Sequence, residues 1–477
     1  MKPGLASPHY WTMLGIAVIA FAMVSPNVPA PAPLPATAPA FGPASTHIKH
    51  VITIVMENRD YDEYFGEYCL VLGTYCSDTG NGIPSSACIP ITPGNPAAGC
   101  VKPYNYTARQ YVYSDLPHNW GSGRIALDNG AMDGFYSAES GASQAFGHYN
   151  GSTIPIYWDM AEEYAMADNA FAGNLSYSLP NHWTIVSGSV LSTPFSSYLN
   201  SASSRTAYLT QANNTQTIAN LLNGTNVSWR YYDYALSPWS KAVNNTGVVT
   251  DGSAINYWNP MAAQPLSYTS SYNSHFVART QFLTDAAAGA LPNISWLIPS
   301  WSESDHPGTN ITAGMAFVAQ AVNAVEQSPD WNSTAIFLVW DDYGGFYDQV
   351  APPLISGDLL SFRTPFIVIS PFARENYIDH HFLDFFSILH FSEWQFGLGC
   401  LSTLDCNATE PFGLFNFNQT ARPPITFPVN AITASYPMPL QIRAYGQVWG
   451  YIYVPTDPLD WNANSTLPPG VTLIDEA

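Results

Sequence analysis

The chain has 477 residues, of which 47% are hydrophobic and 14% aromatic, so it can bury a large core and is not globally disordered. Charged residues make up only 10%, and 35 Asp and Glu against 14 Lys and Arg give a formal net charge of -21 at pH 7. A surface of this charge repels polyanions, which argues against nucleic acid as a partner.

The N-terminal region predicts export. An uncharged apolar stretch over residues 13–24 follows Lys2, and its length suits a secretory signal while being short for a membrane span. Residues 26–44 are rich in Pro and Ala and predict an extended linker. No clean cleavage site is visible, so cleavage of a signal and retention as a membrane tether both stay open. We assign residues 1–46 to this signal or anchor segment and expect an extracellular or cell-surface protein.

Two further features agree with export. The six cysteines fall into close sequence pairs, which favours disulfides over the alternative of a zinc site and leaves their connectivity open. The pairs are Cys69 with Cys76, Cys88 with Cys100, and Cys400 with Cys406. Sequons for N-glycosylation are numerous. Asn, Ser, Thr and Tyr replace the missing charged residues, and because their hydrogen bonding does not depend on pH, we interpret the composition as adaptation to an acidic exterior.

Two buried-strand patterns end on groups that bind metal ions. The apolar run over residues 51–56 is followed by Glu57-Asn58, and a similar run over 335–340 is followed by Asp341-Asp342. In open α/β sheets, ligands bind beyond the carboxyl ends of the strands. The two pairs of oxygen ligands therefore predict one metal-centred site. The alternative is two ordinary strand-to-loop junctions, where Asp and Asn are common.

The other elements predict an α/β fold. Residues 77–106 are rich in Gly, Pro, Ser and Asn and predict a disulfide-stapled surface excursion. Residues 195–280 have few aliphatic runs and predict an insertion or cap of irregular and short β structure. Periodicity predicts helices over 156–169, 313–325 and 382–396, strands over 294–299 and 365–370, and a hairpin over 440–454. This alternation predicts a mostly parallel sheet with helices on both faces.

Ser178 and His306 are candidates for the chemistry. Pro180 suits the first turn of a helix, which places Ser178 at a helix N-terminus, where free N–H groups favour an anion. A serine there suits a nucleophile that attacks a phosphoryl group, and the alternative is a simple N-cap. His306 follows the strand over 294–299, so an acid/base or phosphate-contacting role stands beside a structural hydrogen bond.

The chain resembles a known family over about residues 47–405. The segments HVITIVMENRDYDEYFG, SLPNHW, SDHPG and VWDDYGGFYDQVAPP occur in the order found in the bacterial and archaeal phosphoesterases. LPHNW, GAMDGF and DMAEEYAMADNAF also match this pattern. The family groups phospholipase C-like enzymes with respiratory-burst-inhibiting acid phosphatases. The resemblance implies an alkaline phosphatase-like α/β/α sandwich, formed as one phosphoesterase domain over residues 47–477.

The resemblance also implies roles for individual residues. The ligands of one or more divalent metal ions (Ca, Mg, Mn or Zn) would be Glu57, Asn58, Asp341 and Asp342. The nucleophile would be Ser178, and the histidines that bind phosphate or transfer protons would be His306 and His118. The residues expected to contact the substrate are Asn181, His182 and Asp305.

Departures from the family pattern guide the functional prediction. Asp341-Asp342-Tyr343 stands where many members have Asp-Glu-His, and this favours the acid phosphatase branch. Gln349 stands where a His is frequent, and Trp258-Asn259-Pro260 replaces a His-Asn-Pro motif. We predict a secreted acid phosphatase that hydrolyses small phosphomonoesters through a phosphoserine. The alternatives are a phospholipase C-type phosphodiesterase acting at a phospholipid headgroup, and a non-catalytic cell-envelope protein.

Overall fold

The computed structural model describes residues 47–68, 81–107, 114–191, 202–233, 257–264, 270–429, 438–444 and 447–454. The predictions for residues 1–46 and for the pair Cys69 and Cys76 lie outside these ranges. No helix within them is both long and apolar enough to cross a membrane.

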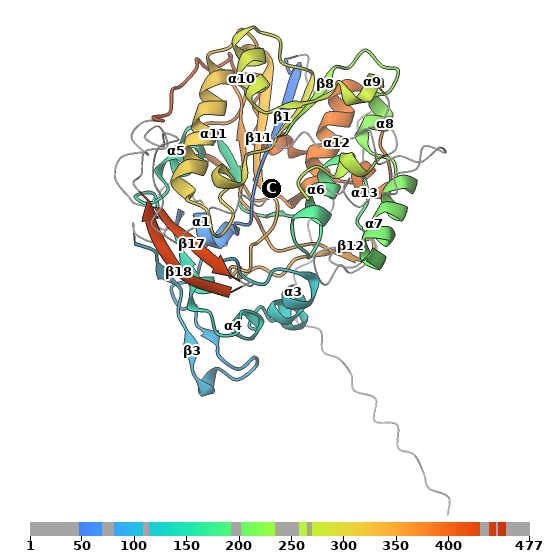
Figure 1. The fold of residues 1–477 in the computed structure, drawn as a ribbon. Helices are drawn as coiled ribbons and strands as arrows, with labels where there is room; N and C mark the ends of the chain where they lie inside the picture. The colour runs from blue at the N-terminus through green and yellow to red at the C-terminus, as the bar shows by residue number, and fades with distance from the viewer. Residues whose placement is uncertain are drawn as a thin grey trace, which may run out of the picture. The chain divides into compact units, whose positions relative to one another are not determined.

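The described part of the chain is built around one eight-stranded sheet. Its strand order is β15 (Tyr377–Asp379), β6 (Ala165–Ala167), β14 (Phe366–Ile369), β11 (Thr334–Trp340), β1 (His50–Met56), β10 (Ile294–Leu297), β8 (Trp229–Asp233) and β9 (Phe276–Ala278). Every pairing is parallel except the two made by β14. A parallel sheet of this kind presents the carboxyl ends of its strands along one edge (Figure 1).

The two central strands are the ones predicted to carry the site. The side chains of β11 are buried throughout and those of β1 are buried from Val51 to Met56, which explains their continuous apolar sequences. They pair in parallel register from His50 opposite Thr334 to Met56 opposite Trp340. The residues that follow, Glu57 and Asp341, therefore leave the sheet side by side.

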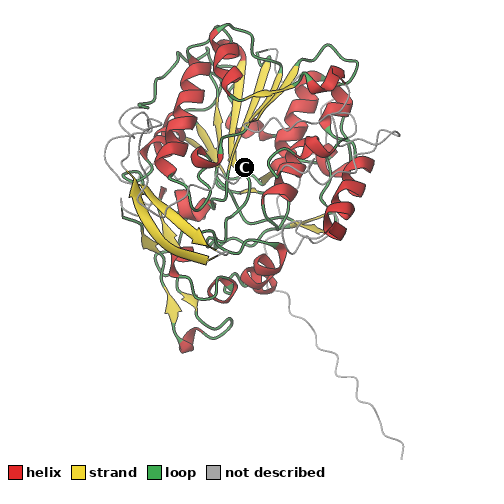
Figure 2. Ribbon diagram, in the orientation of Figure 1, coloured by secondary structure: helices red, strands yellow, loops and turns green. Residues whose placement is uncertain are grey.

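Helices cover both faces of the sheet, as predicted (Figure 2). On one side lie α5 (Pro155–Glu163), α10 (Thr280–Ala287) and α11 (Ile311–Glu326), and on the other lie α6 (Ser178–Val186) and α12 (Phe385–Phe396) (Figure 1). The helices predicted over 313–325 and 382–396 are α11 and α12. The predicted fold class, an α/β fold with a mostly parallel sheet, is confirmed.

The sequence predictions differ from the structure in two places. The helix predicted over 156–169 ends at Glu163, because residues 165–167 pair with β14 and β15 as strand β6. From the region predicted as an insertion, β8 and β9 join the central sheet. The sequence of β8, WRYYD, has buried Trp and Tyr in place of an aliphatic run. Its strand character comes from packing within the sheet.

Several further elements lie outside the central sheet. The excursion predicted over 77–106 contains β2 (Ile89–Pro90) and β3 (Cys100–Val101), which pair antiparallel and are joined by the disulfide Cys88–Cys100. The predicted C-terminal hairpin is formed by β17 (Met438–Ala444) and β18 (Gln447–Val454). Helices α7 (Ala202–Asn214) and α8 (Ile218–Leu222) precede β8.

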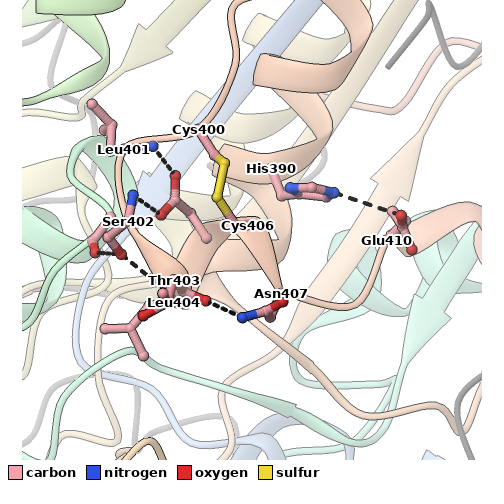
Figure 3. The surroundings of a disulfide bond; sticks show 11 residues. His390, Cys400, Leu401, Ser402, Thr403, Leu404, Cys406, Asn407 and Glu410 are labelled. Atoms are coloured by element: carbon pink, nitrogen blue, oxygen red, sulfur yellow. Dashed lines mark hydrogen bonds and ion pairs between the residues drawn. A yellow bond between two sulfur atoms is a disulfide. The ribbon is translucent and has the colours of Figure 1, made fainter. Parts of the chain in front are cut away.

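The second disulfide fixes the far end of α6. Cys400 and Cys406 close a short loop that contains α13 (Thr403–Cys406) (Figure 3). The Asp405 carboxylate accepts hydrogen bonds from the backbone N–H of Leu401 at 2.6 Å and of Ser402 at 2.7 Å. The Ser402 hydroxyl donates to the carbonyl of Gly188, just beyond the end of α6. The loop therefore anchors the helix that begins at Ser178.

Glu393 of α12 is buried beside this loop. Its carboxyl lies against the Asp405 carboxylate, and a side-chain hydrogen bond between the two favours the protonated form of Glu393. Burial, and secondly the charge of Asp405, raise the pKa of Glu393 to about 10. Burial likewise raises the pKa of Glu63 to about 8 and that of Glu139 to about 9. The folded protein therefore holds protons that the unfolded chain releases at lower pH.

Stability is expected to fall as pH rises because of these carboxyls. The unfolded chain releases the Glu393 proton near the ordinary pKa of 4.5, whereas the folded chain keeps it until about pH 10, so the free energy of unfolding decreases between these values. We expect Glu393→Gln, which stays neutral at every pH, to match the wild-type Tm at pH 4 and to exceed it increasingly up to pH 9.

Thermal unfolding followed by circular dichroism across this pH range measures the difference. The control is Glu375→Gln, at a side chain that is 70% exposed, for which no growing difference is expected. A Tm difference between Glu393→Gln and wild type that stays constant with pH would contradict the prediction.

Candidate active site and metal centre

The ends of β1 and β11 are tied together through Asp341. Its backbone N–H donates to the carbonyl of Met56 at 2.9 Å. Its carboxylate Oδ1 accepts hydrogen bonds from the backbone N–H of Asn58 at 2.7 Å and of Asp342 at 2.9 Å. The two predicted pairs, Glu57-Asn58 and Asp341-Asp342, therefore form one cluster, as the sequence predicted.

The local sequence is suited to this tight junction. Asn58 has a φ of 55°, in the left-handed region that Asn tolerates better than most residues. Gly344 has a φ of 60°, and a Cβ placed on it would lie 2.3 Å from the carbonyl oxygen of Asn58. Its N–H donates to Asp342 Oδ1 at 2.8 Å. Only glycine fits this position without displacing Asn58.

Helix α6 places two side chains against Glu57. Ser178 and His182 stand one helical turn apart and so share a face. The Ser178 hydroxyl donates to Glu57 Oε2 at 3.0 Å, and His182 Nε2 lies 2.8 Å from Glu57 Oε1 and 3.8 Å from Asp341 Oδ2. Tyr177 occupies the N-cap position. The alternative that Ser178 is a simple N-cap is therefore wrong.

The donor groups around Glu57 fit a divalent cation. The oxygens Asn58 Oδ1, Asp341 Oδ2 and Asp342 Oδ2 are buried without a hydrogen-bond partner in the described residues. Unpaired buried oxygens are costly unless they bind an ion. Atoms of Glu57, His182 and Asp341 also lie within 4.8 Å of one another. Oxygen ligands with one imidazole suit several ions and do not choose between Ca, Mg, Mn and Zn.

The placement of His182 revises its predicted role. We expected a substrate contact, but the ring lies among the candidate metal ligands. Burial lowers the pKa of His182 to about 4, so the ring is neutral. In the tautomer with its proton on Nδ1, the Nε2 atom offers a lone pair to a cation. The four-residue spacing from Ser178 was the sequence signal that could have revealed this shared placement.

The acidic groups of the cluster repel one another when their charges are not balanced by a cation. Burial, followed by the charges of Asp341 and Asp342, raises the pKa of Glu57 well above its ordinary value. Burial and then Asp341 do the same for Asp342. A bound divalent cation would reverse both effects, because it stabilises the ionised carboxylates.

His118 lies beside Asn58. Its Nδ1 is 2.6 Å from the carbonyl oxygen of Leu116, and its Nε2 is 2.9 Å from Asn58 Nδ2. These contacts favour a neutral ring that donates a hydrogen bond through Nδ1 to Leu116 and accepts one at Nε2 from the Asn58 amide. Burial alone would lower the pKa of His118, but the charges of Asp342 and Asp115 outweigh it and raise the value to about 9. We assign the neutral form to the cation-loaded site, where the charge of Asp342 is cancelled. In this form the ring accepts the Asn58 amide, and the phosphate-binding or proton-transfer role expected of His118 stays a prediction.

His306 belongs to a loop fastened to Glu57. The backbone N–H of Glu57 donates to the carbonyl of Ser304 at 2.8 Å. The His306 ring is buried, and its Nδ1 is 2.8 Å from the carbonyl oxygen of Pro307, so Nε2 is the atom left for chemistry. Burial lowers the pKa of His306. This position agrees with the predicted placement of His306 at the carboxyl edge of the sheet.

Asp305 and Asn181 make hydrogen bonds that hold the local backbone, and the substrate contacts expected of them stay a prediction. Asp305 Oδ2 accepts hydrogen bonds from Tyr157 at 2.7 Å and from Tyr64 and Trp340, each at 3.1 Å. Asn181 Nδ2 donates to the carbonyl of Ser176 at 2.9 Å, and its Oδ1 accepts from the N–H of Asn174 at 2.8 Å. The φ of 70° at Asp305 is one backbone feature of this turn that sequence spacing does not reveal.

Two buried arginines that the sequence did not single out hold the loops of the site. Arg59 donates to the carbonyl oxygen of Asp305 through Nε at 2.8 Å and Nη2 at 2.6 Å. Arg363 Nη2 donates to Asp62 at 2.9 Å and Asp348 at 2.7 Å. Full burial of two guanidinium groups in a chain with few cations indicates that these connections organise the loops after β1 and β11.

Known proteins resemble the chain over most of its length. Phospholipase C B of Mycobacterium tuberculosis is 25% identical over 430 residues, which cover 80% of this chain and 79% of that protein. Non-hemolytic phospholipase C of Pseudomonas aeruginosa is 23% identical, covering 74% and 54%. Non-specific phospholipase C6 of Arabidopsis thaliana is 22% identical, covering 69% and 62%.

Similar solved structures include a protein of the alkaline phosphatase superfamily from Vibrio parahaemolyticus, 12% identical with a TM-score of 0.33, covering 53% of this chain and 62% of that one. Murine ectonucleotide pyrophosphatase/phosphodiesterase 5 is 10% identical with a TM-score of 0.35, covering 55% and 95%.

The family itself is identified by a match that includes every element of the cluster. The model of the Phosphoesterase family matches residues 48–399, which contain β1, α6, β10 and β11. The relatives named above are phospholipases C, enzymes that cleave phosphate esters. The chain therefore belongs to the Phosphoesterase family and is a hydrolase that acts on phosphate esters.

Proposed function

We propose that the protein is a secreted acid phosphatase that hydrolyses phosphomonoesters through a phosphoserine on Ser178. The observation that carries the proposal is the Ser178 hydroxyl, 3.0 Å from Glu57 at the start of α6. Beside it lie the unpartnered oxygens of Asn58, Asp341 and Asp342. A nucleophile next to a cation cradle is the arrangement that phosphoryl transfer needs.

The first step forms the phosphoserine. A divalent cation held by Asn58, Asp341 and Asp342, with Glu57 and His182, would polarise the phosphoryl group and acidify the serine hydroxyl. Ser178 Oγ forms a bond to phosphorus while the bond from phosphorus to the leaving oxygen breaks. The hydroxyl proton moves along the existing hydrogen bond to Glu57. Free N–H groups in the first turn of α6 are available to phosphate oxygens.

The second step hydrolyses the phosphoserine. His306 keeps Nδ1–H on the Pro307 carbonyl, so its Nε2 exchanges protons with the substrate side. In the first step the protonated ring gives a proton to the leaving alkoxide. In the second step the ring, now neutral, takes a proton from the attacking water. Glu57 returns its proton to Ser178 Oγ as phosphate leaves. Because the pKa of His306 is lowered by burial, the protonated form becomes more populated toward acid pH, which supports an acidic working range.

Phospholipase C-type cleavage is the second candidate. It is favoured by the names of the relatives, of which phospholipase C B of M. tuberculosis is matched over 79% of its length. The same steps apply when the phosphorus carries a second ester group, as in a phospholipid headgroup. A non-catalytic cell-envelope role fits less well, because Glu57, Ser178, Asp341 and Asp342 are all present and assembled. The disulfides Cys88–Cys100 and Cys400–Cys406 support export.

Replacing the nucleophile should abolish turnover. We expect Ser178→Ala to lower kcat for a chromogenic phosphomonoester by about a thousandfold or more while leaving the Tm unchanged within a few degrees. The matched control is Ser85→Ala at an exposed serine. Mass spectrometry of acid-quenched wild type should detect one phosphate on the peptide that contains Ser178. Activity of Ser178→Ala within about tenfold of wild type would remove Ser178 from this role.

Removing the metal should stop catalysis and loosen the fold. We expect chelator-treated protein to be inactive, to regain activity when a divalent cation is added, and to unfold at a lower temperature than the loaded form. Asp342→Asn should retain less metal, measured by elemental analysis after gel filtration. The control is Asp358→Asn, on the short strand β13 (Asp358–Leu359). Full activity in metal-free protein contradicts this site.

The two candidate functions separate by substrate. We expect kcat/KM at acid pH to be at least about tenfold higher for a chromogenic phosphomonoester than for the matching choline phosphodiester. The opposite order would favour the phospholipase C function. Absence of turnover on both substrates, with metal supplied, would favour the non-catalytic role.

A further inference from the structure

Two tryptophans are linked to His306 by ring contacts. Trp301 begins the short helix η8 (Trp301–Glu303), and its ring lies 4.2 Å from the His306 ring at an angle of 36°. The ring of Trp258 is stacked with that of Trp301, at 5.9 Å and 7°. We call Trp258 and Trp301 the aromatic wall.

The wall is fixed to the same backbone as the site. The Ser304 hydroxyl donates to the carbonyl of Trp301 at 2.9 Å, and the carbonyl of Ser304 accepts the N–H of Glu57 at 2.8 Å. On the other side, Tyr231 of β8 donates to the carbonyl of Trp258 at 2.5 Å. The wall is therefore positioned by β8 and by the Glu57 loop, next to the histidine proposed to face the leaving group.

Trp301 is unusual in its exposure. It is 53% exposed, and within the described ranges it is the only aromatic residue among the exposed large hydrophobic side chains. A single exposed hydrophobic residue is normal on a protein surface. An indole that contacts a second tryptophan and an active-site histidine, and still leaves about half of its surface exposed, offers a preformed stacking surface for a ligand.

The charge around the wall indicates the kind of ligand. Glu303, the carboxylate of η8, is already paired with Arg279 at 2.7 Å and also accepts from Ser300. The wall thus presents an apolar π surface, and the carboxylate nearest to it in the sequence, that of Glu303, is neutralised by Arg279. Stacking with a flat ring suits such a surface better than capture of a cation.

We propose that Trp301, supported by Trp258, forms a subsite for the alcohol portion of the substrate and selects phosphate esters of alcohols that carry a flat aromatic ring. The inference rests on the proposed function, because it places the leaving group beside His306. The aromatic ring of the ester stacks on Trp301, while the phosphate lies at Ser178.

A matched substrate set tests the subsite. Benzyl phosphate and ethyl phosphate have similar alcohol leaving groups and differ in the ring, and phosphocholine adds a cation in place of the ring. We expect Trp301→Ala to lower the ratio of kcat/KM for benzyl phosphate to that for ethyl phosphate at least about tenfold relative to wild type, mainly through KM. Trp301→Phe, which keeps a ring, should retain most of the ratio. Leu354→Ala, at a side chain 69% exposed, is the control and should leave the ratio unchanged.

Binding measured apart from turnover keeps the test independent of the proposed chemistry. Calorimetry with metal-loaded Ser178→Ala should give tighter binding of benzyl phosphate than of ethyl phosphate, and adding Trp301→Ala should remove the difference. An unchanged ratio and unchanged binding in the Trp301→Ala variants would overturn the subsite while leaving the proposed function intact. A loss confined to phosphocholine would overturn the choice of an aromatic ring. Wild type that binds benzyl phosphate preferentially but turns over none of the esters would contradict the proposed function and support the subsite.

Discussion

The site is governed by the repulsion between acidic side chains that lie close together in a buried space at the ends of two adjacent parallel strands. Glu57, Asp341 and Asp342 lie where β1 and β11 end, and burial makes their charges expensive. Backbone N–H groups of Asn58, Asp342 and Gly344 compensate part of the charge. The remaining oxygens point to a cation. Much of the surrounding architecture keeps these charges together: the parallel register, the glycine behind Asn58 and the helix that brings Ser178.

The scarcity of positive charge determines how the loops are held. Arg59 binds the backbone carbonyl of Asp305, and Arg363 bridges the carboxylates of Asp62, in the short helix α1 (Tyr61–Phe65) after β1, and of Asp348, after β11. None of these hydrogen bonds joins a guanidinium group to the cluster around Ser178. In the proposed mechanism the positive charge needed by the phosphate would therefore come from the cation, from the N-terminus of α6 and from a protonated histidine.

Much of this site could be predicted because continuous apolar strands are recognisable in sequence and parallel strands share an edge. Glu57, Asn58, Asp341 and Asp342 come together for that reason. The roles of His182, Asn181 and Asp305 could not be predicted in the same way, since they depend on which direction a side chain takes from a helix or a turn. The place of β8 in the central sheet was missed because its aromatic residues lack an aliphatic pattern, so only short β structure of an insertion was expected there. The role of the buried arginines in holding the loops gave no local signal, because Asp305 lies far from Arg59 in the sequence and Asp62 lies far from Arg363.

The loop closed by Cys400 and Cys406 has a consequence for where the protein can become competent. Through Ser402 and Gly188 this loop secures the end of the helix whose first residue is Ser178. The bond forms only where thiols are oxidised, so a chain still in a reducing cytosol lacks the closure that holds this helix in place. Full support of the end of α6 therefore requires an oxidising environment.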